Sequence, residues 1–237
     1  MDKSDKNIIR CNKISKQFGY FLALKKISFM IRENTIFGIA GANGAGKTTL
    51  IKILSGLLKP TFGTIEIEGM SYKDHSNILK QNIGITTDES FLYEELTIFE
   101  NLTFYGNLHL NFKKTILKSK IEQLVEKFHL KDWINEPVGV LSHGMKQKVE
   151  LIRALIHNPS ILFLDEPFSG LDYNATAMLI NFFKELKNNE KISIILATHK
   201  IEVFQQICDD LIILKQGKIN KAFLNEQFNE TEIKSYF

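Results

Sequence analysis

The stretch Ile36-Phe-Gly-Ile-Ala-Gly-Ala-Asn-Gly-Ala-Gly-Lys-Thr-Thr-Leu-Ile-Lys-Ile-Leu54 joins an apolar run, a glycine-rich turn and a segment of helical period. The run Ile36–Ala40 predicts a buried strand, and Lys47–Leu54 predicts a helix. Between them, Gly41–Thr48 fits the pattern G-x-x-x-x-G-K-[ST], in which backbone N–H groups surround phosphate. The motif lies between a strand and a helix, as its mechanism requires, and this predicts a phosphate-binding loop rather than an ordinary glycine-rich turn.

Two side chains at the end of this loop have the chemistry that a bound nucleotide needs. Lys47 would reach the β- and γ-phosphates, and Thr48 would bind Mg²⁺ through its hydroxyl. The glycines allow the backbone to turn its N–H groups inward, and the N-terminus of the next helix adds a favourable dipole. We therefore expect a nucleoside triphosphate with Mg²⁺ at this loop.

Short apolar runs alternate with helical segments along the chain, which predicts an α/β fold with a mostly parallel, buried core sheet. Further core strands are expected at Ile161–Leu164, Ile192–Ala197 and Leu211–Leu214. Three N-terminal segments predict an antiparallel flank with one exposed face, namely Ile8–Asn12, Ile27–Ile31 and Thr64–Ile67.

Helical periodicity dominates from Ile98 to His157, which predicts a helical subdomain inserted into the core. We expect a single domain over residues 1–237, with the α/β core and β subdomain at about 1–87 and 158–220. The helical subdomain would span about 88–157, and a short, weakly helical tail would span 221–237. The apolar positions that define the helical period are Ile98, Leu102, Tyr105, Leu108–Leu110, Ile116–Phe128, Met145, Val149, Ile152, Leu155 and Ile156.

The charge balance disfavours a nucleic-acid partner. Thirty basic and 27 acidic residues give a net charge of +3, too small an excess for the basic stripe of a duplex-binding protein. The polar stretch Met1–Asn7 does not resemble a signal peptide, and no run of about 18 uncharged apolar residues occurs. We therefore expect a cytosolic protein that would serve a membrane only through a partner.

A pair of acids follows one predicted core strand, in Ile161-Leu-Phe-Leu-Asp165-Glu166. The carboxyl edge of a parallel sheet is where such folds present charge to a ligand. Asp165 suits a Mg²⁺-linked role, and Glu166 is a candidate for polarising an attacking water. A solvated strand end is the alternative, which the upstream phosphate loop makes less attractive.

The segment Leu141-Ser-His-Gly-Met145 precedes an amphipathic helix that runs to His157. Ser142 is a natural N-cap, and capping alone would explain it. A serine hydroxyl at a glycine-flanked helix N-terminus is also an anion site, which could face a second phosphate-binding loop. The segment by itself does not separate these two interpretations.

The joint order of these motifs resembles the ATP-binding cassette (ABC) ATPases over about Ile8 to Ile219. After the phosphate loop come Leu-Ser-x-Gly at a helix start, a strand with Asp-Glu-Pro, Ser169-Gly-Leu-Asp172, and Ala197-Thr-His199. The resemblance implies the P-loop ABC-ATPase fold, an ATPase that uses ATP and Mg²⁺, and a working dimer. Five motifs in the correct order make this resemblance specific.

The resemblance also implies roles for individual residues. Phe18 would stack on adenine, although a core phenylalanine is the alternative; Asp172 would communicate across the dimer; and His199 would sense the γ-phosphate beside the catalytic Glu166 and Lys47. The signature residues Ser142, Gly144 and Met145 would contact nucleotide held by the opposite subunit. The implied metal ligands are Thr48, Asp165 and Asp88, and the implied ATP-binding residues are Phe18, Gly41, Asn43, Gly44, Ala45, Gly46, Lys47, Thr48 and Thr49.

Two departures from the family pattern narrow the resemblance. Asp88, in Ile83-Gly-Ile-Thr-Thr-Asp88, stands where the family usually has glutamine, and the signature has His143 for glycine and Met145 for glutamine. Being shorter and charged, Asp88 could approach the γ-phosphate only through Mg²⁺ or water. Together with Leu96–Leu102, these residues look most like the branch that exports peptides, lantibiotics, bacitracin or other drugs.

The resemblance implies a second copy of the chain, or a paralogous subunit, and integral membrane subunits as partners. The expected location is the cytoplasmic face of the membrane. Phe91, Leu92, Tyr93 and Leu96 either line a docking groove for the membrane partner or pack within the helical subdomain. A soluble ABC protein acting on nucleic acid or ribosomes is a second hypothesis, and a regulatory nucleotide-binding module with weak hydrolysis is a third.

Overall fold

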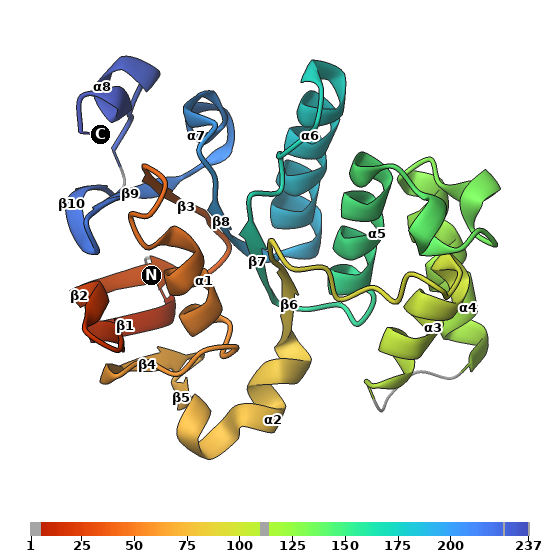
Figure 1. Ribbon diagram of the computed structural model, residues 1–237, viewed down its shortest axis with the longest axis horizontal. Coiled ribbons are helices and arrows are strands. Elements are labelled where there is room, and N and C mark those ends of the chain that lie inside the picture. The colour runs from red at the N-terminus through yellow and green to blue at the C-terminus, as the bar shows by residue number, and fades with distance from the viewer. Residues whose placement is uncertain (1–5, 110–113, 225, 237) are drawn as a thin grey trace, which may run out of the picture.

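The computed structural model describes residues 6–109, 114–224 and 226–236, and its strands form two separate sheets (Figure 1). The larger sheet has the order β10-β9-β3-β8-β7-β6, and its pairs are parallel apart from β9 with β10. This confirms the expected α/β fold with a mostly parallel core sheet. Its strands are β3 (Ile36–Gly41), β6 (Ile83–Thr86), β7 (Ile161–Asp165), β8 (Ser193–Ala197), β9 (Asp210–Lys215) and β10 (Lys218–Phe223).

Strands β7 and β8 are buried at every position, because both faces of the central sheet are covered. Leu162 and Leu196 pack in one core cluster, whereas their neighbours Phe163 and Ile195 pack in the other. Alternation between two cores explains why these strands read as continuous apolar runs in the sequence. Because β8 pairs in parallel with both β3 and β7, the carboxyl ends of these three strands lie at one edge of the sheet.

The smaller sheet is antiparallel, in the order β2-β1-β4-β5, and confirms the expected N-terminal flank. Its inner face contributes Ile14 and Leu24 to a core cluster that also contains Leu50 and Leu54 of α1 (Lys47–Leu54). Helix α1 is therefore held between the two sheets, which fixes the loop before it. The strands are β1 (Asn7–Phe18), β2 (Phe21–Arg32), β4 (Phe62–Ile67) and β5 (Met70–Ser71).

The predicted helical middle segment is largely confirmed, and Figure 1 shows it at the opposite end of the molecule from the antiparallel sheet. Helix α3 begins with a capping box between Thr97 and Glu100. The prediction at Leu110 lies outside the described residues. The segment comprises α3 (Ile98–Asn107), α4 (Lys114–Lys127), the 3₁₀ turns η1 (Lys131–Trp133) and η2 (Val138–Val140), and α5 (His143–Leu155), against which α6 (Tyr173–Glu190) packs.

The C-terminal segment differs from the weakly helical tail expected after Lys218. Lys218–Phe223 instead form β10, paired with β9 because Gln216 and Gly217 make a turn with positive φ angles of 50° and 76°. A short helix, α8 (Glu230–Lys234), follows and buries Ile233. The regular structure thus continues past residue 220.

Strand β6 and three helices were not among the expected elements. β6 is only four residues long and contains Gly84, whose α-carbon lies so close to helix α5 that an added Cβ would stand 2.2 Å from the Ala154 carbonyl oxygen. Close packing thus explains a glycine that weakens the local strand signal. The helices are α2 (Tyr72–Asn82), α6 and α7 (Ile201–Ile207). Among the residues that the structure describes, none of the helices has the length and apolar character of a membrane-spanning segment.

Candidate functional site

The loop between β3 and α1 has the backbone conformation that its glycines allow. Gly41, Gly44 and Gly46 have φ angles of 152°, 78° and 106°, a region that residues with a side chain rarely adopt. A Cβ at Gly44 would meet nothing within 4 Å, so this side of the loop is open. Among the described residues, no side chain caps the N-terminus of α1. The free N–H groups and the open face together form an anion site.

Lys47 is folded back across this loop. Its Nζ donates hydrogen bonds to the carbonyl oxygens of Gly41, at 2.9 Å, and Ala42, at 3.4 Å, and only 6% of the residue is exposed. A buried ammonium over an uncapped helix N-terminus concentrates positive charge at the loop. Asn43 is exposed beside it, Ala45 is buried, and Thr48 and Thr49 are half-buried in the first turn of α1.

Asp165 at the end of β7 has the properties of a metal ligand. It is 4% exposed, and neither carboxylate oxygen has a hydrogen-bond partner in the described chain. Burial raises its pKa to about 6, the charges of Asp88 and Glu166 act in the same direction, and nearby Thr48 and Lys47 act against them. A buried carboxylate without a partner is costly unless a cation neutralises it. These residues therefore fit Mg²⁺.

The protein ligands for such an ion would be few. Within the described ranges no group of three or more His, Cys, Asp or Glu side chains could hold a metal. Mg²⁺ is usually bound through one or two carboxylates together with substrate phosphates and water. Asp165 and the Thr48 hydroxyl beside the phosphate loop match this pattern, in which the nucleotide completes the site.

Glu166 and His199 are in direct contact. The Nδ1 atom of His199 lies 2.9 Å from Glu166 Oε2, and the backbone N–H of His199 donates to the same oxygen at 3.2 Å. β7 and β8 lie side by side, and Glu166 N donates to Ala197 O, so both residues come to one edge. Glu166 has a φ of 49°, which is a strained conformation for a residue other than glycine. Strained backbone of this kind is common at functional sites.

The signature segment begins α5, and Ser142 is its N-cap. Ser142 Oγ accepts a hydrogen bond from Met145 N at 3.3 Å. A Cβ at Gly144 would meet only Leu171, at 3.7 Å. Packing within the chain therefore does not require glycine here, and the backbone at this turn remains accessible. The capping interpretation of Ser142 is confirmed, and its trans role stays a prediction.

The loop Ser169–Asp172 lies against this signature turn. A Cβ at Gly170 would stand 2.9 Å from the imidazole Cδ2 atom of His143, so the ring packs against the glycine. Asp172 caps α6 by accepting a hydrogen bond from Ala175 N at 2.7 Å. Lys200, next to His199, donates to the Leu171 carbonyl at 3.3 Å. The loop is thus in contact with both the signature and the strand end that carries His199.

Asp88 is exposed in the turn after β6 and forms an ion pair. Its Oδ1 lies 3.3 Å from Nζ of Lys52, a residue of α1, and Glu89 Oε1 lies 3.0 Å from the same nitrogen. The two acids raise the pKa of Lys52 against the effect of burial. The partner of Asp88 in this state is therefore a lysine that the sequence reasoning did not single out.

A buried ion pair of α5 also holds this turn at both ends. Glu150 accepts hydrogen bonds at 2.7 Å from Ser90 Oγ and Phe91 N, and Arg153 donates to Ile85 O at 2.6 Å. Arg153 Nε lies 2.7 Å from Glu150 Oε2. Sequence reasoning missed this pair, because charged residues on a helix usually face solvent. The pair connects the signature helix to the turn that carries Asp88.

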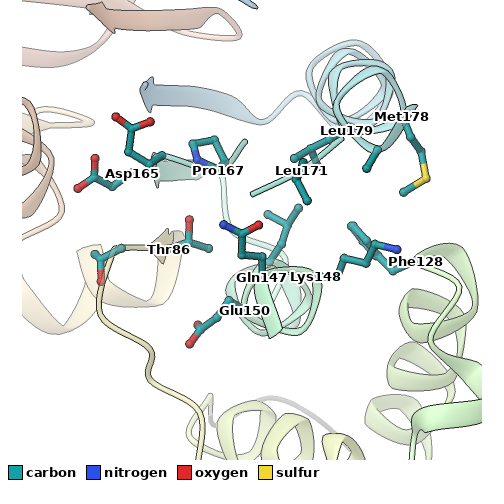
Figure 2. A pocket seen from close by; sticks show the side chains of 14 residues that line it. Thr86, Phe128, Gln147, Lys148, Glu150, Asp165, Pro167, Leu171, Met178 and Leu179 are labelled. Carbon is teal, nitrogen blue, oxygen red and sulfur yellow. The ribbon is translucent and has the colours of Figure 1, made fainter. Parts of the chain in front are cut away.

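Asp165 and Glu166 form an acidic edge at the carboxyl end of β7, and a cavity of about 70 Å³ lies behind it, between α5, α6, β6 and β7. Figure 2 shows Gln147 in the middle of it, with Thr86 and Asp165 on one side and Leu171 and Leu179 on the other. The amide oxygen of Gln147 is buried and has no hydrogen-bond partner in the residues described. The acidic edge thus lines an interior space that is polar at one end and apolar at the other.

Phe18 lies at the end of β1 and is 47% exposed, which excludes the core alternative. Lys16 Nζ stands 5.0 Å from the centroid of its ring. An exposed aromatic ring beside a cation can stack on a base, which is the role that the sequence resemblance implies for Phe18.

The four residues considered for a docking groove are not equivalent. Leu92 is 8% exposed and packs in the core, whereas Tyr93 is 47% exposed. Tyr93 forms an aromatic group with Phe104 and Tyr105, with its ring centroid 5.4 Å and 6.4 Å from theirs. The packing alternative therefore applies to Leu92, and Tyr93 with Phe104 forms the exposed apolar surface.

Comparison with known proteins gives consistent results. A family model described as ABC transporter matches residues 24–169. The ABC transporter ATP-binding protein NatA of Bacillus subtilis is 36% identical over 89% of this chain and 85% of that protein. The sulfate/thiosulfate import ATP-binding protein CysA of Synechocystis is 32% identical over 92% of this chain and 61% of that protein. A solved dimeric ATP-binding cassette in a post-hydrolysis state, bound to ADP and Pi, shares the fold with a TM-score of 0.85. It is 24% identical, and the match covers 93% of this chain and 100% of that one.

Proposed function

The chain belongs to the ABC transporter family, and from this premise we propose that it powers export of a peptide, antibiotic or drug through separate membrane subunits. As an ABC transporter ATP-binding subunit it binds and hydrolyses ATP, with Mg²⁺ as cofactor. Asp88 in place of glutamine, together with a separate signature that reads Leu-Ser-His-Gly-Met over residues 141–145, supports assignment to the exporting branch. Relatives such as CysA are importers by name, so the direction of transport needs its own test.

The proposed catalytic roles follow from the acidic edge. Lys47 and the loop glycines would hold the β- and γ-phosphates, and Thr48 with Asp165 would hold Mg²⁺, which neutralises phosphate charge when bound. Glu166 would accept a proton from the attacking water. Both bonds from His199 end on Oε2 of Glu166, and Oε1 has no hydrogen-bond partner among the residues described. That free oxygen is the acceptor available to water.

The proposed working unit is a dimer with a second copy or a paralogous subunit. Ser142, Gly144 and Met145 stand at the start of α5, while the phosphate loop precedes α1, and Figure 1 places these helices on different sides of β7. A second subunit in head-to-tail arrangement would bring one such helix N-terminus over the partner's nucleotide. Around Gly144 a Cβ would meet only Leu171 among the described residues, at 3.7 Å, so packing within the chain leaves room for this approach.

The membrane subunits would dock on the helical subdomain, over residues 88–157. Tyr93 and Phe104 give an exposed apolar surface there, 47% and 41% exposed, beside the Glu150–Arg153 pair that holds the Asp88 turn. A coupling path from the nucleotide to the membrane partner would therefore pass through this turn. In this proposal the chain lies at the cytoplasmic face of the membrane through its partners.

Transport by the complex tests this proposal. The chain is co-expressed with the membrane proteins that co-purify with it, and inside-out vesicles are supplied with ATP and labelled peptide or drug substrates. Accumulation inside such vesicles that is lost in Glu166→Gln supports export. ATP-dependent movement out of the vesicles would contradict it, and a complex without membrane subunits would contradict the transport role.

A further inference from the structure

Helix α1 carries a second lysine on the face that meets the acidic edge. Thr48 and Lys52 are four residues apart, so they lie on one side of the helix, one turn apart. Lys52 Nζ reaches across to Asp88 Oδ1 at 3.3 Å and Glu89 Oε1 at 3.0 Å. The helix that begins at the phosphate loop thus also holds the acidic turn after β6.

Negative charge is concentrated where this contact is made. Burial is the main cause of the raised pKa of Asp165, and the charges of Asp88 and Glu166 act in the same direction. A further unpaired carboxylate at this edge would increase the repulsion. Lys52 is the cation that faces Asp88, and its side chain, 22% exposed, is less exposed than those of Asp88, at 60%, and Glu89, at 72%.

We propose that Lys52 is a positioning residue, which holds Asp88 and balances its charge, and thereby sets how strongly divalent cation and nucleotide bind together. Unlike a neutral glutamine, an aspartate at position 88 adds a negative charge beside Asp165 and Glu166, and Lys52 offsets that charge. The inference rests on the proposed function, because it assumes that Mg²⁺ and ATP meet at Thr48 and Asp165.

The contact of Lys52 with two carboxylates restrains Asp88 and still allows its side chain to move. Lys52 contacts two carboxylates, so it retains Glu89 when Asp88 turns toward the metal. The pair is partly exposed and therefore contributes little to stability of the fold. Its consequence lies in the position and charge of Asp88, and variants of Lys52 should fold.

The quantity to measure is the ratio of two dissociation constants for a fluorescent ATP analogue, one in EDTA and one in saturating Mg²⁺. This ratio reports the coupling between metal and nucleotide and does not depend on hydrolysis. Lys52→Met frees Asp88 and removes a charge that repels Mg²⁺. We expect the ratio to rise about two- to fivefold, the range that one partly exposed ion pair supports.

Two further variants separate positioning from a simple field effect. In an Asp88→Asn background no carboxylate is released, so the rise caused by Lys52→Met should be at least about twofold smaller. Lys52→Arg keeps the ion pair and should restore the native ratio. Lys187→Met is the control: the Lys187 side chain, 23% exposed, is as exposed as that of Lys52. Its partner Asp209 is 30% exposed and lies at the opposite end of β3, where it accepts a hydrogen bond from Ile36 N.

An unchanged ratio in Lys52→Met would overturn the inference, as would an equal rise with and without Asp88, which would reduce Lys52 to a distant charge. Both results would leave the proposed function intact. Failure of the native chain to bind the analogue under either condition would instead overturn the proposed function, and this inference with it.

Discussion

His199 and Glu166 contact each other through two hydrogen bonds that end on one oxygen, from His199 Nδ1 at 2.9 Å and from its backbone N–H at 3.2 Å. The arrangement fixes the orientation of a carboxylate whose backbone is already in a strained region. It also links the ends of β7 and β8, the two strands that carry the acidic edge and the histidine. A substitution of either residue therefore removes contacts that orient the other.

Glu166→Gln should lower ATP hydrolysis by about 10²- to 10⁴-fold, because an amide cannot accept the proton of the attacking water. Nucleotide binding should persist, since the loop and Lys47 are unchanged. ATP should therefore hold this variant in a dimer, which size-exclusion chromatography with and without ATP would detect. Monomer alone in the presence of ATP would count against dimer closure.

Lys47→Ala should abolish binding of ATP. The lysine is 6% exposed and its Nζ bonds two loop carbonyls, so the variant loses both the cation and a brace of the loop. Calorimetric titration with Mg·ATP would test this. Lys59→Ala, an exposed lysine outside the loop, serves as the control, and undiminished affinity in Lys47→Ala would show that the site is elsewhere.

Metal binding should release protons near pH 6, and far fewer at pH 8. Burial raises the pKa of Asp165 to about 6, so at that pH about half of the chains carry a proton that the metal must displace. Because the pKa is raised, the folded chain keeps this proton up to a higher pH than the unfolded chain does. The metal-free fold therefore loses stability as the pH rises toward 6, and bound Mg²⁺ offsets this loss. Titration of Mg·ADP in buffers with different heats of ionisation measures the released protons. Equal release in Asp165→Asn would assign it to another group.

Breaking the Glu150–Arg153 pair should destabilise the fold strongly. Arg153→Met leaves the buried carboxylate of Glu150 without its cation, and we expect a loss of about 2–4 kcal/mol in the free energy of unfolding. Urea unfolding measures it. Lys127→Met removes an exposed pair with Glu185 and should cost less than about 0.5 kcal/mol. Similar losses in the two variants would mean that the buried Glu150–Arg153 pair stabilises the fold no more than an exposed pair does.

Phe18→Ala should weaken ATP binding by about 1–2 kcal/mol, because one aromatic stacking contact with the base is lost. Tripolyphosphate, which has no base, should bind both proteins equally. Phe18→Trp keeps an aromatic ring and should retain affinity. If Phe18→Ala weakened tripolyphosphate and ATP to the same extent, the ring would be supporting the loop and not the base.

The parts of the site that the sequence predicts are those built from consecutive residues. The phosphate loop, its strand and its helix are contiguous in the sequence, so the sequence pattern alone defines their relative positions. The same holds for Asp165 and Glu166 at the end of β7. Ser142 as a cap follows likewise from local rules. These elements were predicted closely, to within a residue or two of their observed bounds.

Contacts between distant segments could not be predicted from one sequence. Glu150 and Arg153 meet residues at sequence separations of 59 to 68, and neither partner carries a motif. In the sequence alone, Lys52 fits the solvent-exposed side of a short helix, and only the position of β6 shows that Asp88 lies beside it. Strand β10 was missed because its polar alternation, Lys218–Phe223, carries information only once β9 is there to pair with it.

The central claim is that one subunit's Lys47 and a second subunit's Gly144 act on the same nucleotide, and mixing two inactive variants tests it most directly. Lys47→Ala and Gly144→Asp should each be inactive alone. Their mixed dimer has one intact site, so an equimolar mixture should recover about a quarter of the native ATPase activity, since half of randomly formed dimers are mixed. No recovery above the sum of the separate variants, or full activity of Gly144→Asp by itself, would contradict the account.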